Sequence, residues 1–241
     1  VIWTDPAISY KLVLKNAAGV TQYTVDNVSG LVASSQVTFT QSGSGAASRT
    51  LQAKAREIFT PEDFGAVGDN VNDDTTAINN ALAAGQAVVG KPGSNYRMTS
   101  RITVPSGKFV IGTRSTTFTM DTGAGFFDAT TLADYGAVDG VGFFFNSSTG
   151  GGLIGVRVKL SNRTAELIAG AVLVRSSSKV QINDCEFDNF SKAKVVRFES
   201  CTLSEAKNSY FHDCEISSAT TGQLTGIDVD DNRPSGGSTG L

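Results

Sequence analysis

The chain has 241 residues and a formal net charge of −3, and only 18% of its residues are charged. Gly, Ser, Thr and Asn together exceed a third of the chain, while 40% is hydrophobic, which is enough for a core. Many short strands joined by polar turns are typical of this composition. The acidic balance argues against nucleic-acid binding, and no apolar run approaches the ~18 residues of a membrane span.

The cysteine and histidine content limits the chemistry further. Three cysteines, at positions 185, 201 and 214, are an odd number and lack CxxC spacing, so we expect neither a disulfide framework nor a zinc site. His212 is the only histidine. A histidine-rich metal site is therefore excluded, any Ser-His-Asp triad would depend on that residue, and we expect no metal and no cofactor.

The first 45 residues show the alternation of apolar and polar side chains that strands show. Strands are predicted at 8–14, 20–25 and 36–40, with a turn at 16–19. Residues 1–45 are thus expected to form a small antiparallel β module. Residues 41–45, QSGSG, have the composition of a flexible linker.

A short helix is predicted next, over residues 49–58, with Ser48 as its N-cap. Leu51, Ala55 and Ile58 would lie on one face of it. Because this apolar face is narrow, the helix needs a partner, such as copies of itself from other subunits. Residues 46–62 are therefore expected to be a linker and neck helix.

A second helix is predicted over about 73–84. Asp73 or Asp74 can accept hydrogen bonds from its free N–H groups, and Gly85 ends it. Its inward face is expected to consist of Ile78, Ala81 and Leu82. Short strands are predicted after it at 87–89, 101–104, 108–111 and 116–120.

The last third of the chain carries a repeat with an offset of 29 residues. Leu153, Val156 and Val158 recur as Ile182, Cys185 and Phe187, and again as Phe211, Cys214 and Ile216. A helix-free repeat of this length predicts a parallel β-helix, with Cys185 over Cys214 and Phe187 over Ile216. An antiparallel sandwich with two similar strands is the alternative. In a β-helix, the helix at about 73–84 would cover the open first coil.

The region between the two halves resembles a known family. Residues 61–69, PEDFGAVGD, and residues 72–78, NDDTTAI, are similar to the opening of the pectate-lyase-like right-handed β-helix superfamily. The family usually has glycine where Asn70 stands, but asparagine also tolerates the left-handed conformation. In that family the motif is a capping element and not the active site. The resemblance implies that residues 63–241 are the N-terminal part of such a β-helix.

Residues 10–19, 23–28, 37–46 and 51–57 resemble the N-terminal modules of bacteriophage tailspikes and tail fibres. The fold implied is all-β: a small N-terminal antiparallel β module and neck, then a right-handed parallel β-helix capped by a short α-helix. The function implied is a homotrimeric virion component that binds host surface polysaccharide and depolymerises it. Phage tail or baseplate proteins would hold its N-terminal module. The expected location is the phage tail, outside the cell, with no nucleic-acid partner and no membrane insertion.

Two other functions remain open. The protein could be a non-enzymatic tail fibre, adaptor or adhesin that uses the β-helix as a rigid scaffold. It could also be a free bacterial polysaccharide lyase or hydrolase, although the missing secretion signal and the N-terminal module weigh against this. The next copy of the repeat would fall beyond residue 241 and residue 1 is not Met, so we expect a piece of a longer protein.

Outward carboxylates are the candidate chemistry. Glu186 and Glu215 share a repeat position, so stacked coils would place them about 5 Å apart, near the spacing of a retaining glycosidase. A solvated acidic ladder is the alternative, because an acid–base pair needs two different pKa values. A second acidic cluster could face a sugar or hold calcium, or form a hydrated turn. It comprises Asp228, Asp230, Asp231 and Asn232.

The other candidates have structural interpretations. His212 is expected to point outward as a surface residue. Residues 149–152, TGGG, lack the Lys-Ser/Thr of a phosphate loop and predict a turn between coils. Residues 143–145, FFF, could stack on sugars but are more typical of core and subunit contact. The sequence therefore leaves the catalytic and polysaccharide-binding residues unassigned.

Overall fold

A computed structural model describes residues 9–29, 33–124, 140–162, 170–190, 194–214 and 225–230. The chain divides into two compact units, Val1–Glu57 and Ile58–Leu241. Among the described residues, no helix is long and apolar enough to cross a membrane. Each unit is described by itself below.

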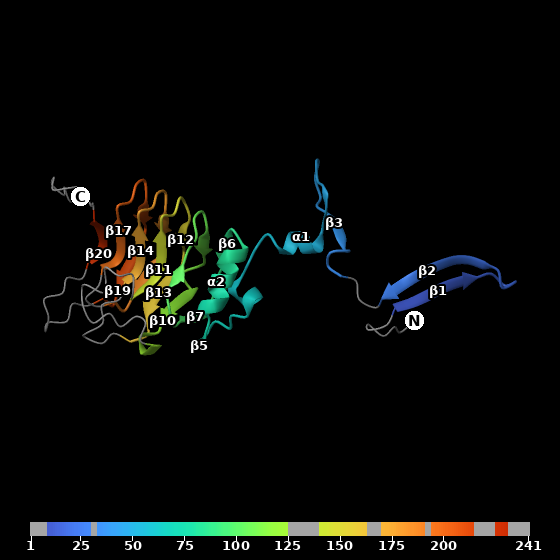
Figure 1. Cartoon of the computed structure of the whole chain (residues 1–241), viewed down its shortest axis with the longest axis horizontal. Helices are drawn as coiled ribbons and strands as arrows, with labels where there is room; N and C mark the ends of the chain where they lie inside the picture. Colours follow the sequence, from blue (N-terminus) through green and yellow to red (C-terminus); the bar gives the residue numbers. More distant parts are fainter. Residues whose placement is uncertain are drawn as a thin grey trace. The chain divides into compact units, whose positions relative to one another are not determined.

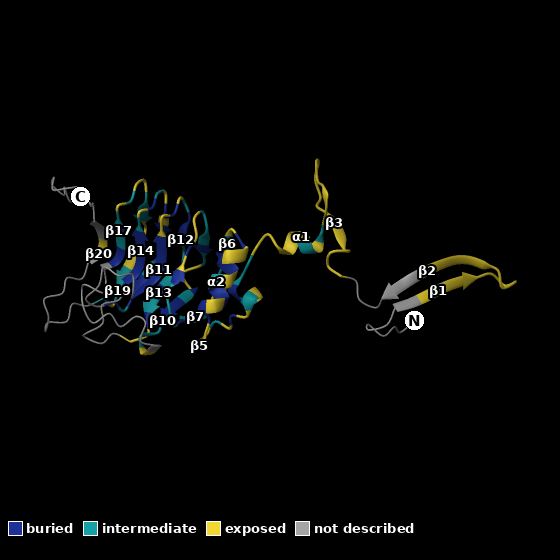
Figure 2. Ribbon diagram, in the orientation of Figure 1, coloured by how far each residue is buried: buried dark blue, intermediate teal, exposed yellow. Residues whose placement is uncertain are grey.

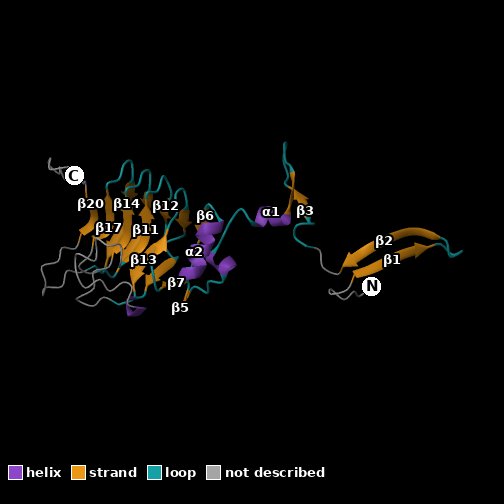
Figure 3. Cartoon of the chain, viewed as in Figure 1, coloured by secondary structure: helices purple, strands orange, loops and turns teal. Residues whose placement is uncertain are grey.

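The first unit contains two antiparallel hairpins (Figure 3). Strands β1 (Ser9–Lys15) and β2 (Thr21–Ser29) form one, and β3 (Thr38–Thr40) and β4 (Ser48–Thr50) form the other. The three predicted strands are therefore confirmed, but they do not form one sheet, because the third pairs with β4. The expected linker at 41–45 is instead the loop of the second hairpin.

The neck helix is shorter than predicted. Helix α1 spans Leu51–Ala55, and its N-cap is Thr50, whose hydroxyl accepts a hydrogen bond from the Ala53 N–H. The prediction of a helix from Arg49 with Ser48 as cap was wrong, because Ser48 and Arg49 pair with β3. A five-residue helix cannot carry the predicted stripe, and Ile58 lies outside it.

The described residues of the first unit are not buried. Where the exposure of its described residues is known, none is buried (Figure 2). Val13 and Leu14 point to opposite faces of β1, and both are exposed. Since an isolated hairpin is at best marginally stable in water, this unit needs further contacts to stay folded.

The second unit is a β-helix with three parallel sheets. Sheet I contains β6 (Ala87–Val89), β9 (Phe109–Ile111), β12 (Gly152–Ile154), β15 (Gln181–Asn183) and β18 (Glu205–Lys207). Sheet II contains β5 (Asp69–Asp73), β7 (Asn95–Met98), β10 (Thr117–Met120), β13 (Arg157–Leu160), β16 (Glu186–Asp188) and β19 (Tyr210–His212). Sheet III contains β8 (Ile102–Thr103), β11 (Val141–Asn146), β14 (Gly170–Arg175), β17 (Lys194–Glu199) and β20 (Thr225–Asp230).

In chain order, the strands of this unit visit sheets I, II and III in turn, so β6–β8 form coil 1 and β18–β20 form coil 5 (Figure 1). The predicted β-helix is thus confirmed, and the sandwich alternative is excluded because every pair in these sheets is parallel. Strands β5 and β7 were not predicted, because their sequences are polar.

Side chains of the three sheets fill the space between them. Phe118 of β10 lies between Tyr96 of the coil below and Phe143, with ring centroids 5.1 and 5.3 Å apart respectively. Two coils further along from Phe118, the ring of Phe187 stacks on that of Phe211 at a centroid distance of 5.2 Å. Burial raises the pKa of Tyr96 to about 12. The interior is therefore a ladder of aromatic and aliphatic side chains that repeats from coil to coil.

Helix α2 (Thr75–Ala84) packs on the first coil beside the 3-10 helix η1 (Pro61–Phe64), and both contact the start of the β-helix (Figure 1). Its predicted inward residues Ile78, Ala81 and Leu82 are all buried. Asp73 provides the predicted capping, because its Oδ1 accepts hydrogen bonds from the Thr75 N–H and hydroxyl. The predicted cap over the first coil is confirmed.

Asn70 in the motif and Gly85 at the end of α2 have different backbone conformations. Asn70 adopts a left-handed conformation with φ 63°, as the substitution for the family's glycine requires. Gly85 ends α2 as predicted, but in an extended conformation. Glycine is needed there because a Cβ atom would lie 2.4 Å from the Phe59 ring.

The predicted repeat is correct for one step between coils and wrong for the next. Leu153 pairs with Ile182 and Val158 with Phe187, which confirms the offset of 29. The next coil is shorter: Ile182 pairs with Ala206, and Phe187 with Phe211, an offset of 24. Cys214 therefore does not lie over Cys185, and Ile216 lies outside the described residues.

Candidate functional site

The outer face of sheet II carries a cluster of charged side chains on coils 3 to 5, which we call the charge cluster. It consists of Arg157, Lys159, Glu186, Asp188, His212 and Asp213. Alternation along β13, β16 and β19 places the first five of these side chains outward, because the residues between them are the buried Val158 and Phe187 and the half-buried Phe211. Asp213 follows β19 and is exposed.

Strand register brings the charges together. Arg157 pairs directly with Glu186, and Lys159 with Asp188. The guanidinium of Arg157 lies 2.6 Å from Asp188 Oδ2 and 3.3 Å from Glu186 Oε1, and Lys159 Nζ lies 3.3 Å from Asp188 Oδ2. Opposite charges on neighbouring strands stabilise the pairing of β13 with β16.

His212 adds the next coil to the cluster. Its Nε2 lies 2.5 Å from Glu186 Oε1, and its Nδ1 lies 3.0 Å from Asp213 Oδ2 and 3.6 Å from Asp188 Oδ1. Hydrogen bonds to Asp213 and Glu186 raise the pKa of His212 above its ordinary value. The side chain is outward, as predicted, but it forms a bridge between coils 4 and 5 and is more than a solvated surface residue.

This bridge predicts a pH dependence of stability. A raised folded-state pKa means that the stabilisation is fully present below the ordinary histidine pKa of about 6.5 and is lost as pH rises through the raised value. Since His212 is the only histidine, His212→Gln should flatten the dependence of Tm on pH above about 6.5. Thermal unfolding of both proteins at several pH values measures this. An equal slope in the variant would show that the bridge contributes nothing.

The cluster is better suited to binding than to proton transfer. Asp188 exposes only 3% of its side chain, so it cannot reach a substrate, and Arg157 contacts both Asp188 and Glu186. A glycosidase needs two accessible carboxyl groups with different protonation states. Glu186, His212 and Arg157 remain partly exposed and offer hydrogen-bonding groups to a ligand.

Asp188, His212 and Asp213 could in principle hold a metal, since their ligand atoms all lie within 4.8 Å of one another. Arg157 and Lys159 already supply positive charge to Asp188. A divalent cation would have to approach against these two charges, so the cluster is a set of ion pairs rather than a metal site.

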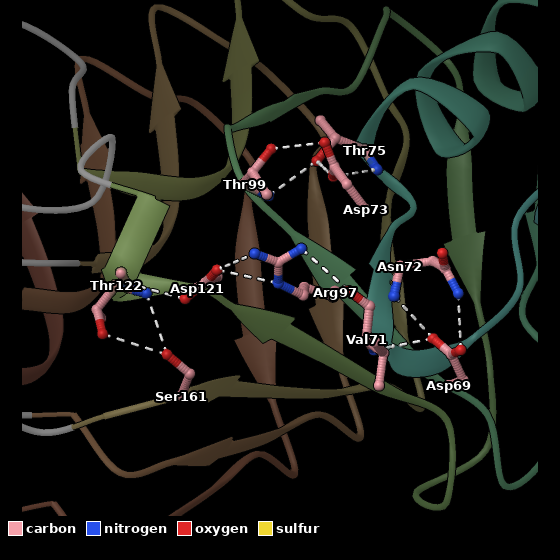
Figure 4. Close-up of polar contacts among 11 residues, drawn as sticks. Asp69, Val71, Asn72, Asp73, Thr75, Arg97, Thr99, Asp121, Thr122 and Ser161 are labelled. Carbon is pink, nitrogen blue, oxygen red and sulfur yellow. Dashed lines mark hydrogen bonds and ion pairs between the residues drawn. The ribbon is translucent and has the colours of Figure 1, made fainter.

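A second polar network lies on sheet II nearer the cap (Figure 4). Arg97 donates from Nε to Asp121 Oδ2 at 2.9 Å and from Nη1 to the Val71 carbonyl at 3.1 Å. Asp73 Oδ2 accepts from the Thr99 hydroxyl, and although burial opposes it, hydrogen bonds from Thr75 and Thr99 lower the pKa of Asp73. These bonds join β5, β7 and the end of β10.

The outermost residues of this network bind their near neighbours in the structure. Backbone N–H groups of Asn72 and Val71 bind Asp69 and lower its pKa (Figure 4). The Ser161 hydroxyl lies 3.2 Å from that of Thr122, which is part of the 3-10 helix η2 (Thr122–Ala124). Every one of these polar groups has a partner within the chain, so the network holds the first coils together and offers no open site.

The register on which the candidate carboxylate pair depended is not the one observed. The residue opposite Glu186 in the next coil is Tyr210, because the offset is 24 there. Glu215 lies outside the described residues. Sequence reasoning missed Arg157, Lys159 and Asp188, although the alternating charges of RVK at 157–159 and EFD at 186–188 carried the signal at the correct offset.

The remaining candidates fall into three groups. Asp228 and Asp230 lie on β20, where they pair with Arg197 and Glu199, while Asp231 and Asn232 lie outside the described residues. Phe143 and Phe145 lie in the core as predicted, and Phe144 is buried in a separate cluster with Val141 and Leu173, so none of the three can stack on a sugar. The TGGG segment is the predicted turn, and it leads into β12 at Gly152.

The cysteines carry no evident chemistry. All three are free thiols. Cys185 is buried, and burial raises its pKa to about 11, so its reactive thiolate form is scarce at neutral pH. Cys201 is half-buried and its pKa is also raised by burial.

Comparison with known families now identifies the class. The family described as rhamnogalacturonase A/epimerase, pectate lyase-like, matches residues 58–235, so the chain belongs to this family. The match covers the β-helix unit and its cap. No curated protein sequence matches the chain.

Two solved tailspike structures show the same fold at low sequence identity. A mutant tailspike protein of E. coli bacteriophage HK620, in complex with a pentasaccharide, is similar over 82% of this chain with a TM-score of 0.56 and 12% identity. Tailspike protein 3 of bacteriophage CBA120 is similar over 86% with a TM-score of 0.51 and 14% identity. The surface protein and adhesin PfbA of Streptococcus pneumoniae is similar over 68% with a TM-score of 0.49 and 17% identity. This chain spans 42%, 39% and 43% of those chains respectively, which is less than half of each.

Proposed function

We propose that the protein is a tailspike-type virion component that attaches to a host cell by binding, and as a full-length protein degrading, surface polysaccharide. The observation that carries this proposal is the charge cluster, a partly exposed set of hydrogen-bonding groups fixed on a rigid, capped β-helix. The fold shared with two tailspike proteins, one of them holding a pentasaccharide, supports it. A flat polar face on stacked strands suits an extended, hydroxyl-rich ligand.

The exposed apolar residues of the first unit support the part of the proposal that concerns trimer formation and attachment to the virion. Its hairpins expose apolar residues on both faces and bury none of those whose exposure is described. Contacts with two further copies of the chain would cover them, which is the proposed homotrimer. Residues 1–45 would form the virion-proximal module that binds tail or baseplate proteins, and 46–62 the neck. The proposed location is the phage tail, outside the cell.

Incubation of the full-length protein with host capsule or lipopolysaccharide tests the proposal. We expect binding together with released oligosaccharides, detected as new reducing or unsaturated chain ends. Binding without new ends would favour the non-enzymatic fibre or adhesin. Cleavage by a protein that sediments as a monomer would favour the free bacterial lyase or hydrolase. Absence of both binding and cleavage would overturn the proposal.

A further inference from the structure

An exposed tyrosine lies at the edge of the charge cluster. Tyr210 begins β19, two residues before His212, so both side chains point to the outer face of sheet II. Tyr210 is 53% exposed, whereas its neighbour Phe211 packs into the interior against Phe187. An aromatic ring left accessible beside fixed polar groups is the usual platform for the apolar face of a sugar ring.

Arg114 reaches this ring from a distant coil. Its guanidinium carbon lies 4.5 Å from the centroid of Tyr210, which is a cation–π contact. Arg114 lies in the turn before β10, and β10 is separated from β19 by β13 and β16. At about 4.8 Å per strand, the contact extends roughly 14 Å along the β-helix and passes over two coils. Even with Arg114 in place, half of the tyrosine stays accessible.

The charged groups around the Tyr210 ring differ in whether they already form ion pairs within the chain. Glu186 is bound by Arg157 and His212, Asp188 by Arg157 and Lys159, and Asp213 by His212, which is a cation only when it is protonated. Among the described residues Arg114 forms this cation–π contact and neither an ion pair nor a side-chain hydrogen bond. Arg114 is therefore the cation at this position that no carboxylate of the described residues has already bound.

We propose that Tyr210 and Arg114 form a binding subsite for a negatively charged sugar residue of the polysaccharide. The sugar ring stacks on the accessible part of Tyr210, and Arg114 binds its carboxylate or phosphate through two parallel hydrogen bonds. Glu186 and His212 lie next to the ring and accept and donate hydrogen bonds to the hydroxyl groups. This subsite rests on the proposed polysaccharide function, which it deepens by naming the residues and the charge of the ligand.

A glycan array with acidic oligosaccharides and their carboxyl-reduced counterparts tests the subsite. We expect wild-type protein to bind at least one acidic glycan more tightly than its reduced form, and less tightly as salt rises. Tyr210→Ala should weaken that binding about tenfold or more, which corresponds to about 1.4 kcal/mol, and Tyr210→Phe should retain it. Arg114→Gln should weaken binding of the acidic glycan but leave the reduced glycan unaffected. Leu203→Ala, at an exposed apolar residue between β17 and β18, is the control.

The outcomes separate the subsite from the function. Glycan binding that survives both Tyr210→Ala and Arg114→Gln, or that prefers the reduced glycans, overturns the subsite and leaves the proposed function standing. No binding to any glycan on the array, or to the host polysaccharide itself, overturns both. Thermal unfolding of each variant checks its fold, and Tyr210→Phe, which keeps the ring, separates loss of stacking from loss of the last coil.

Discussion

Replacing Gly152 with alanine is expected to prevent the β-helix from folding, or to lower its Tm by more than about 10 °C. A Cβ atom at this position would lie 2.0 Å from the main-chain oxygen of Gln181, its partner in the next coil. Main-chain atoms cannot move aside as a flexible side chain can, so β12 and β15 would have to separate. Loss of this pairing should cost at least about 4 kcal/mol, and circular dichroism during heating measures it.

Gly150→Ala is the matched control, two residues away in the same turn. Gly150 has a φ of 74°, but its Cβ position has no heavy atom nearer than 4.0 Å. The alanine there carries only the strain of the left-handed conformation, about 1–2 kcal/mol. If the two variants unfold at the same temperature, close approach to Gln181 is not what requires glycine at 152.

Asp74→Ala is expected to lower the free energy of unfolding by about 3–5 kcal/mol, or roughly 6–20 °C in Tm. Asp74 is 1% exposed and accepts hydrogen bonds from three backbone N–H groups, those of Val67, Gly68 and Arg97. It therefore joins the motif loop, the start of α2 and strand β7. Its removal leaves several donors without an acceptor at the covered end of the β-helix. Chemical denaturation followed by fluorescence measures the change.

Asp69→Ala provides the comparison. Asp69 also accepts three hydrogen bonds, but they come from Val71 and Asn72 in its own turn, and it is exposed. Its loss should cost less than about 1 kcal/mol. Asp74→Asn should be nearly as harmful as Asp74→Ala, because an amide turns one acceptor into a donor that faces other donors. A small effect of Asp74→Ala would mean that the loop and β7 hold together without it.

The cap of the β-helix was predictable because its signals are local. The polar start of α2, its buried face and the left-handed Asn70 follow from neighbours in the sequence. The role of Asp74 did not, because its partners include Arg97, 23 residues away. The start of the helix predicted over residues 49–58 was wrong for a similar reason. Ser48 and Arg49 have a helix-compatible sequence, but they pair with β3 as part of a strand.

The repeat was misaligned because different corners of the β-helix have the same local chemistry. Asp184 and Asp213 both have a left-handed backbone and both precede a cysteine, yet one follows sheet I and the other follows sheet II. Other left-handed corner residues include Ser147, Ser176, Asn189, Ser200 and Asn208. Sequence similarity between corners therefore identified the turn type and not the coil position. The charge cluster depends on the true offset, so its full membership could not be predicted.

In the last three coils of this β-helix, the length of the coil varies at one corner. From sheet I to sheet II the last three coils use the same short step: Ile154 to Arg157, Asn183 to Glu186 and Lys207 to Tyr210. From sheet II to sheet III the step changes each time, from Leu160 to Gly170, Asp188 to Lys194 and His212 to Thr225. The strands remain in register throughout, so this corner can gain or lose residues without disturbing the stack. It is the natural place to graft or trim a segment, and a lineage of such proteins could change the surface beside sheet II while the scaffold stays constant.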